Sequence, residues 1–478
     1  MDNLKEKTAK GIAWGAINNG TTQVLNLVIG IFLARLLTPG DYGIVGVLGI
    51  FSAVALTLQT SGFSQALVNL KHPTDNDYNS VFWFNILVSL ALYVILFFCA
   101  PLIAAFFHQP CLVAVSRVLF LCIPIYALGI TSGARLIKNM MNREIAIIGI
   151  TAIVLSGTVA ITLALCGFSY WSLVGQQLVS ALVIVGGRYH FVRWLPSIQI
   201  DFGPVRRMFG FGVKLLATNL IQIFNFQLLT VIFGRFLPIA TVGYYTQANK
   251  WNNLAKTTIS DAVGQVAQTV LVSVNDERER EVRVFRKMLR FTAFLAFPVM
   301  LGLALIAREF IVLLLGSQWT ASVPLLQILC LGGAFLPFYT LYQSMTISSG
   351  RSDLYFWCCV GQMALQLLIV YLCYPYGIEV ILWACAALNV LWLLPWQMAA
   401  HRLIGLRLVD VLKDVVPFLV VALAVMLITW VLTSWIQQLL ILLIVRVLVA
   451  ALLYAGVMKL LHVAIMDECI NFILKRKK

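Results

Sequence analysis

The sequence predicts an all-α, polytopic membrane protein with about fourteen transmembrane helices, arranged as two six-helix lobes followed by two further helices. Of its 478 residues, 61% are hydrophobic and 11% are charged, which is more apolar surface than a soluble fold can bury. The apolar runs are continuous, as in helices, and do not alternate as in a membrane β-barrel. An internal repeat supports the division into two lobes.

The repeat is an Arg, a Leu two residues later and a Gly eight residues after the Arg. Its two copies are Arg35, Leu37 and Gly43, and Arg235, Leu237 and Gly243. Each copy stands where one apolar span ends and the next begins. Because an even number of spans separates the copies, the two modules should be parallel and related by an axis along the membrane normal.

Charge clusters and Pro or Gly breaks divide the chain into spans that are each long enough to cross a bilayer. The predicted spans are 11–36, 42–69, 79–106, 112–134, 144–166, 169–192, 209–236, 241–272, 288–315, 321–347, 354–375, 378–400, 415–435 and 438–461. This predicts an N-terminal lobe over 1–193, a cytoplasmic linker over 194–208, a C-terminal lobe over 209–402, and two additional helices with a basic cytoplasmic tail over 403–478.

The basic residues give the topology. With the N-terminus in the cytoplasm, most of the 34 Lys and Arg residues fall in cytoplasmic segments. Both termini are therefore expected inside. The net charge of +15 then reflects topology and attraction to anionic membrane lipids, and it does not indicate binding of nucleic acid.

Short connections between the spans argue against an enzyme, because they leave no room for a catalytic domain. The five His are far apart and the ten Cys form no Cys-x-x-Cys pair, so we predict no metal and no cofactor. Gly129 and Gly133, four residues apart, are interpreted as a helix-packing pattern.

Polar residues inside the spans are the candidate site. The first span of each lobe carries an amide stripe: Asn19, Gln23 and Asn26 in one, and Asn219, Gln222 and Asn225 in the other. Two matching stripes favour a polar cavity between the lobes, although hydrogen bonds between helices would explain a single stripe equally well.

The span 241–272 is too polar to face lipid. We predict that Lys250 and Lys256 line a water-filled cavity that holds an anion, because a buried Lys is costly in a membrane. Lys256 could instead pair with Asp261, and Lys250 could reach outward. The other candidates are Tyr244, Tyr245, Asn249 and Trp251, with Arg35, Arg117, Arg235 and Arg446 as additional cations; Arg308 and Glu309 are expected to form a surface ion pair.

Several segments resemble one protein family. The run 32–43 reads Phe-Leu-Ala-Arg-Leu-Leu-Thr-Pro-Gly-Asp-Tyr-Gly, and with 61–68, 141–144, 171–176 and 234–245 it is similar to the polysaccharide transporter family. That family comprises the Wzx-type oligosaccharide flippases of the multidrug/oligosaccharidyl-lipid/polysaccharide exporter superfamily. The resemblance implies a V of two lobes around a cationic cavity, a groove formed by the last two helices, and a polyprenyl-pyrophosphate-linked glycan as substrate.

The predicted function is therefore a flippase of the bacterial cytoplasmic membrane that moves such a lipid-linked oligosaccharide to the outer leaflet by alternating access. Its expected partners are the lipid-linked glycan and membrane lipids, with the polysaccharide polymerase and glycosyltransferases as further candidates. Two alternatives remain open: a multidrug or small-molecule exporter of the same superfamily, and a non-transporting membrane scaffold.

Overall fold

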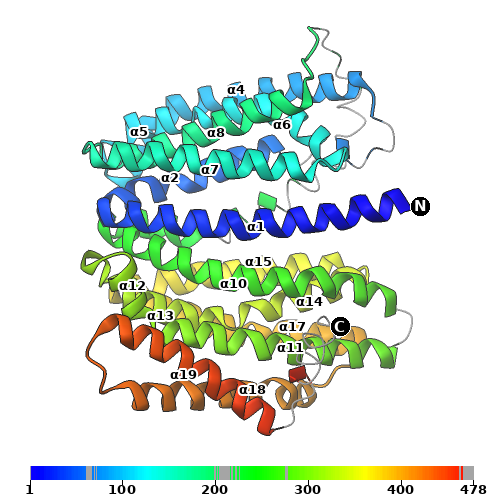
Figure 1. Cartoon of the computed structure of the whole chain (residues 1–478), viewed down its shortest axis with the longest axis vertical. Helices are drawn as coiled ribbons and strands as arrows, with labels where there is room; N and C mark the ends of the chain where they lie inside the picture. Colours follow the sequence, from blue (N-terminus) through cyan, green and yellow to red (C-terminus); the bar gives the residue numbers. More distant parts are fainter. Residues whose placement is uncertain are drawn as a thin grey trace. The chain divides into compact units, whose positions relative to one another are not determined.

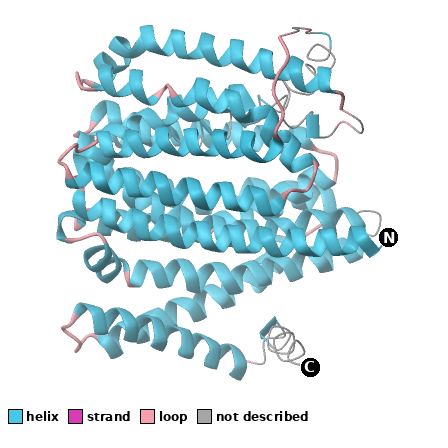
Figure 2. Ribbon diagram, turned by 45° about the horizontal axis from the view of Figure 1, so that its top comes forward, coloured by secondary structure: helices cyan, strands magenta, loops and turns pink. Residues whose placement is uncertain are grey.

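The computed structural model shows a protein built from helices (Figures 1 and 2). It describes residues 2–60, 67–68, 70, 73–198, 201, 203, 216, 219–220, 223–224, 227–274, 278–461 and 465–466. Within these ranges every regular element is an α-helix or a short 3₁₀-helix, as the continuous apolar runs predict.

The first half of the chain holds α1 (Asp2–Leu36), α2 (Pro39–Thr60), α4 (Asp75–Phe107), α5 (Leu112–Leu119), α6 (Cys122–Lys138), α7 (Asn142–Leu165), α8 (Trp171–Val192) and a helix over Gln227–Phe236. The second half holds α10 (Ile239–Val274), α11 (Arg278–Leu305), α12 (Ala307–Leu314), η1 (Ser317–Trp319), α13 (Ser322–Gly333), α14 (Leu336–Ser348), α15 (Ser352–Cys373), η2 (Tyr374–Tyr376), α16 (Ile378–Leu391), α17 (Leu393–Ile404), α18 (Leu408–Thr433) and α19 (Leu439–Leu460).

Within the described ranges, 10 segments are long and apolar enough to cross a membrane. They coincide with ten of the predicted spans, and about fourteen spans in total is compatible with the remaining helices. The four other predicted spans fall on α1, α8, the helix 227–236 and α10. Three of these four carry the amide and lysine candidates, so the least apolar spans coincide with much of the predicted site.

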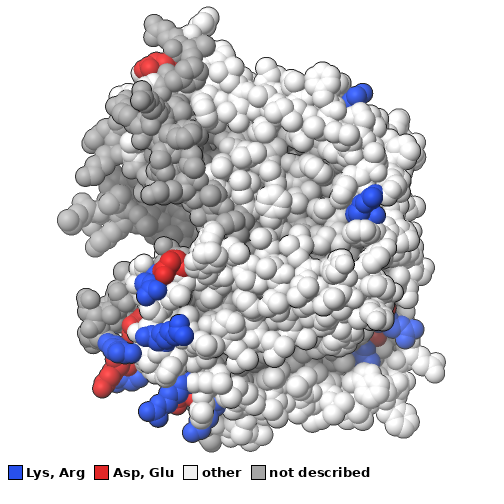
Figure 3. All heavy atoms as spheres, turned by 180° about the vertical axis from the view of Figure 1, so that it is seen from behind, with Lys and Arg blue, Asp and Glu red and all other residues white. Residues whose placement is uncertain are grey.

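The surface agrees with a membrane setting. Large apolar side chains are exposed along the helices; Phe98 is 73% exposed and Leu427 is 63% exposed. The face seen in Figure 3 is mostly uncharged in its middle, and its charged side chains lie toward the two side edges, with most of them at the lower left. Such an apolar girdle needs a lipid solvent.

Four predicted spans are each broken into two helices. The breaks lie between α5 and α6, between α11 and α12, between α13 and α14, and between α16 and α17. Three of these breaks are followed within four residues by a proline: Pro124, Pro337 and Pro395. A proline clashes with the carbonyl four residues earlier and cannot donate a hydrogen bond to it, so the helix turns at that point.

The described chain divides into two compact units, Met1–Gly243 and Tyr244–Lys478. We describe each unit by itself. The lobe boundaries at 193, 208 and 402 remain predictions.

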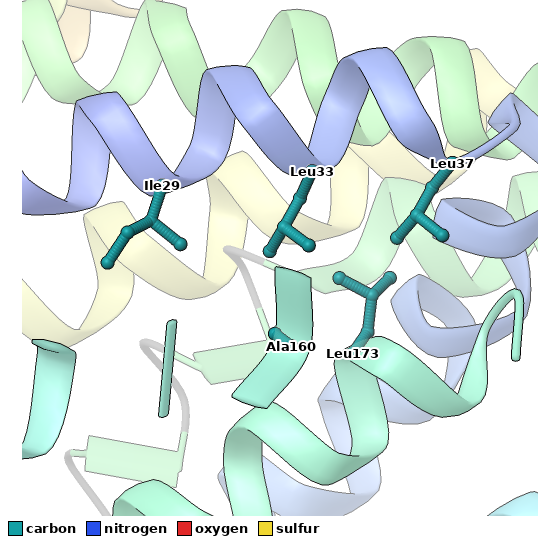
Figure 4. Packing of buried hydrophobic residues seen from close by; sticks show 5 residues of the cluster. All are labelled: Ile29, Leu33, Leu37, Ala160 and Leu173. Atoms are coloured by element: carbon teal, nitrogen blue, oxygen red, sulfur yellow. The ribbon is translucent and has the colours of Figure 1, made fainter. Parts of the chain in front are cut away.

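The core of the first unit begins on one face of α1. Ile29, Leu33 and Leu37 follow one another at intervals of four residues and pack on Ala160 of α7 and Leu173 of α8 (Figure 4). This spacing places the three side chains along one stripe of the helix. Apolar packing of this stripe therefore joins α1 to α7 and α8.

The start of the predicted linker is docked on the first unit. The Trp194 ring lies 6.5 Å from that of Tyr78 and 6.2 Å from that of Phe82, and the indole N–H of Trp83 donates to the Ser197 carbonyl at 2.7 Å. The first residues of 194–208 thus belong to the packed structure.

The first copy of the repeated corner has a capped helix start. The backbone N–H and hydroxyl of Thr38 both donate to one Asp41 carboxylate oxygen at 2.8 Å, and the Asp41 N–H donates back to the Thr38 hydroxyl at 3.4 Å. This is a capping box followed by Pro39 in the first turn of α2. The Ser169 hydroxyl donates to the other Asp41 oxygen, so the corner is also tied to the connection between α7 and α8.

The two copies of the repeat touch each other inside the first unit. A Cβ atom on Gly43 would clash with the backbone carbonyl of Ile239, and one on Gly243 would clash with the backbone carbonyl of Pro39. Pro39 and Ile239 are themselves equivalent positions of the repeat, so the contact is reciprocal. The glycines are required because only a residue without a side chain allows the first turns of α2 and α10 to approach this closely.

We predict that Gly43→Ala and Gly243→Ala each lower the thermal stability of the detergent-solubilised protein. The added methyl group meets a backbone carbonyl, which cannot rotate away, and overpacking of this kind costs about 1–3 kcal/mol. Gly40→Ala is the matched control because its nearest neighbour would be 3.7 Å away. Equal unfolding temperatures for all three variants, measured by intrinsic fluorescence, would contradict the close approach.

Candidate functional site

Helix α10 carries a polar stripe along one face. Lys250, Thr257 and Asp261 are exposed, and Thr246 and Asn253 between them are half-buried. Their intervals of three and four residues place all five side chains on the same side of the helix. The stripe extends over about four turns, or roughly 22 Å at 1.5 Å per residue.

The opposite face of α10 is packed into the second unit. Ala248, Asn252 and Ile259 are buried, and a Cβ on Gly333 of α13 would lie 2.6 Å from the Asn252 side-chain oxygen. The Ser322 hydroxyl, at the start of α13, donates to the Tyr244 carbonyl at 3.0 Å. Packing on α13 therefore fixes which face of α10 is exposed.

Lys250 is the cation of this stripe. The Thr257 hydroxyl donates to the Asn253 carbonyl at 2.7 Å, so this polar group is satisfied within the helix. The ammonium group of Lys250 lies 5.7 Å from the centroid of the Trp251 ring, which is a weak contact beside the cost of a cation facing acyl chains. An exposed Lys on a helix of membrane length therefore needs water or an anion beside it.

Lys256 does not share the stripe. It is half-buried and lies about 120° around the helix from Lys250. Asn249 is also half-buried. The structure therefore places the two predicted lysines on different faces of α10.

The predicted aromatic residues pack within the second unit. Trp251 is 3% exposed and meets Phe310 of α12 edge to face, with centroids 5.0 Å apart. Tyr245 is also buried, and the half-buried Tyr244 meets Trp319 of η1 at 6.1 Å. These rings fix α10 against α12 and η1.

The amide candidates are only partly described. Gln23 and Asn26 of α1 are exposed, as expected for a face that is not used in packing. Asn219 is half-buried. The side chain of Asn19 and the residues Gln222 and Asn225 lie outside the described residues.

Three of the four arginine candidates lie in the first unit. Arg35 is exposed at the end of α1. The Arg117 guanidinium lies 4.3 Å from the Phe97 ring centroid and donates to the Phe97 carbonyl at 3.4 Å. Arg235 donates to the Phe106 carbonyl at 2.7 Å and is 2.8 Å from the His108 ring. Arg117 and Arg235 thus hold helix ends and turns together.

The fourth candidate, Arg446, is buried in the second unit. It donates to Glu309 at 2.9 Å and to the Thr433 hydroxyl at 3.2 Å. The expected surface pair between Arg308 and Glu309 is therefore wrong: Glu309 is 2% exposed and pairs with Arg446, whereas its neighbour Arg308 is exposed. One residue of helix rotation separates the two side chains by about 100°, which places Glu309 toward α19.

Arg446 also borders a cavity of about 510 Å³ within the second unit. Its lining is almost wholly apolar and comes from α11, α18 and α19, with Ala255 from α10 and Ile306. The Glu309 carboxylate neutralises the guanidinium, so the cavity is apolar and uncharged in this arrangement.

The sequence analysis does not single out Arg188 of α8, which lies in the predicted span 169–192. Its guanidinium donates to the Gly129 carbonyl of α6 at 3.0 Å. The glycine pair at 129 and 133 is the sequence signal that could have found this contact. Two glycines four residues apart leave room for a neighbouring helix, and here Arg188 fills that room. No group of three or more His, Cys, Asp or Glu that could hold a metal occurs in the part of the chain that the structure describes.

Comparison with known proteins places the chain in a family. The model of the family described as "Polysaccharide biosynthesis protein" matches residues 32–324, which is more than half of the 478 residues. The chain belongs to this polysaccharide biosynthesis family.

The succinoglycan biosynthesis transport protein ExoT of Rhizobium meliloti (strain 1021) is 26% identical over 378 residues, covering 79% of this chain and 76% of ExoT. The teichuronic acid biosynthesis protein TuaB of Bacillus subtilis (strain 168) is 24% identical over 426 residues, 88% of each chain.

Solved structures show the same fold. The lipid II flippase MurJ in an inward closed conformation matches with a TM-score of 0.72 at 16% identity, covering 94% of this chain and 99% of MurJ. An inward-facing multidrug transporter of the MATE family matches with a TM-score of 0.62 at 15% identity, covering 80% and 94%. The family member described here is thus a multi-pass membrane protein with the fold of flippases and exporters, as its motifs predicted.

The buried ion pair gives a testable prediction for this family member. Glu309→Leu or Arg446→Met should destabilise the protein by about 3–5 kcal/mol, because each leaves an uncompensated buried charge. The double variant Glu309→Leu with Arg446→Met removes both charges and should recover most of that loss.

The measurement is denaturant unfolding followed by helix content, with Arg308→Gln as the control. Because Arg308 is exposed, its variant should unfold like the wild type. A cycle in which the two single effects simply add would contradict the pairing.

Proposed function

We propose that this protein flips a polyprenyl-pyrophosphate-linked oligosaccharide from the inner to the outer leaflet of the bacterial cytoplasmic membrane, for cell-surface polysaccharide biosynthesis. It does so by alternating access, with both termini in the cytoplasm. The glycan and pyrophosphate cross through a hydrated path in the protein, and the prenyl tail stays in lipid.

One observation supports this proposal above the others: the exposed stripe of α10 with Lys250. A pyrophosphate is the part of such a substrate that is most costly to bring into a membrane. A lysine on an exposed polar helix face can offset part of that cost, because charge–charge attraction is stronger where the surroundings are less polar than water. Membership of a polysaccharide biosynthesis family supports a glycan-bearing substrate.

The proposal is tested in proteoliposomes with the lipid-linked glycan that accumulates when the gene is deleted. Lys250→Ala should slow its movement to the outer leaflet by at least about tenfold, since a hydrogen bond to a charged group contributes about 1.5–3 kcal/mol. Lys250→Arg keeps the charge and should retain part of the rate.

Lys459→Ala is the matched control, because Lys459 is an exposed lysine at the end of α19. It should transport at the wild-type rate. Unchanged flipping by Lys250→Ala would remove the lysine from the mechanism. A deletion strain with a normal glycan coat and raised drug sensitivity would favour a small-molecule exporter, and normal flipping without the protein would favour a scaffold.

A further inference from the structure

The break between α11 and α12 has no cause in the local sequence. Unlike the other three described breaks, it is not followed by a proline; Pro298 lies inside α11, and the next proline along the chain is Pro324. The run 303–314 reads Leu-Ala-Leu-Ile-Ala-Arg-Glu-Phe-Ile-Val-Leu-Leu. It contains neither glycine nor proline and is rich in good helix formers, so its own preference is one continuous helix.

Side chains of two other helices bind the carbonyls at this break. Arg446 of α19 donates to the Leu305 carbonyl at 3.3 Å, and Gln327 of α13 donates to the Ala304 carbonyl at 3.3 Å. Both carbonyls belong to the last turn of α11, where the helix itself provides no partner. In a continuous helix the Leu305 carbonyl would accept from the backbone N–H of Glu309. The arginine thus replaces a bond that the backbone could make by itself.

Arg446 holds both sides of the break at once. The Nη1 group that donates to Leu305 also donates to the Glu309 carboxylate at 2.9 Å, and Glu309 lies in the first turn of α12. A cation at the carbonyl end of α11 and an anion at the N–H end of α12 are each favoured by the dipole of the helix they meet. The Nε group donates to Thr433 of α18 at 3.2 Å. The ion pair therefore stabilises the broken form and ties it to α18 and α19.

The apolar cavity of the second unit lies directly beside the break. Residues just before the break form part of its lining, together with Arg446: Gly302, Leu303, Leu305 and Ile306. A close-packed core resists any change in the direction of a helix. An open volume of about 510 Å³ at this point leaves room for these side chains to move.

We infer that the segment 303–309 has two arrangements and that Arg446 selects between them. With the guanidinium on Leu305 and Glu309, the helix is broken. When α19 carries Arg446 away, the Leu305 carbonyl is left without a partner in an apolar site, which is costly. The backbone N–H of residue 309 is the nearest donor, and accepting it joins α11 and α12 into one helix. The position of the hairpin formed by α18 and α19 thereby sets the direction of α12, whatever the protein transports.

The experiment removes the ion pair and measures hydrogen exchange in purified full-length protein. The variant is Glu309→Leu with Arg446→Met, which leaves no unpaired charge, and mass spectrometry with fragmentation resolves the amides of 307–309. Exchange at residue 309 should slow by at least about tenfold, because its N–H gains a helical hydrogen bond. A contact that only stabilises the fold would give the opposite sign, since its loss loosens the segment and speeds exchange.

The matched control adds Arg308→Pro to the double variant. Arg308 is exposed and is the second residue of α12, the place that Pro337 occupies in α14, so a proline there suits the broken form. It cannot donate to the Ala304 carbonyl and would disrupt a continuous helix. The triple variant should therefore lose the added protection at residue 309, whereas Arg308→Gln in the same background should keep it.

Three outcomes would overturn the inference. Unchanged or faster exchange at residue 309 in the folded double variant would make the ion pair a structural contact alone. Slow exchange that persists with Arg308→Pro would show that the protection does not come from helix closure. A double variant that fails to fold, as judged by thermal unfolding, would show that the segment has no second arrangement to adopt.

Discussion

A lipid bilayer provides no hydrogen-bond partners, so each backbone group and each charge of a membrane protein must find its partner within the protein, in enclosed water or in a ligand. Most features of this structure follow from that constraint. Arg446 is buried with Glu309, and the hydroxyl of Thr257 is satisfied by its own helix. Where the described residues show no carboxylate partner, as at Lys250, the same constraint points to water or to an anion.

The two units meet this constraint in different ways. In the second unit the polar stripe of α10 is kept exposed by packing of the opposite face, which includes Trp251 against Phe310. In the first unit the guanidinium of Arg188 lies on the glycine backbone of α6 and donates to the Gly129 carbonyl.

Much of the fold could be predicted because it depends on the order of apolar and charged residues along the chain. Span length follows from bilayer thickness, and ten described segments match that prediction. The breaks before Pro337 and Pro395 agree with the rule that proline disrupts the preceding turn, but the rule alone does not predict them, because Pro101, Pro298 and Pro417 lie inside unbroken helices. The partners of individual charges could not be predicted, because they depend on which helices are neighbours: Glu309 follows Arg308 in sequence but contacts Arg446 in space. The contact of Arg188 with α6 could not be predicted for the same reason, since nothing near Gly133 in the sequence identifies α8 as its neighbour.

The reciprocal contact of Gly43 and Gly243 also limits how this chain can change over time. After a duplication the two copies usually drift apart, because each is free to accept substitutions that the other does not need. Here each glycine leaves room for the backbone at the equivalent end of the other copy, so a larger residue in either would be felt by both. The corner is thus a place where the two copies of the repeat must stay alike, while the helices that follow differ, apolar in α2 and polar in α10.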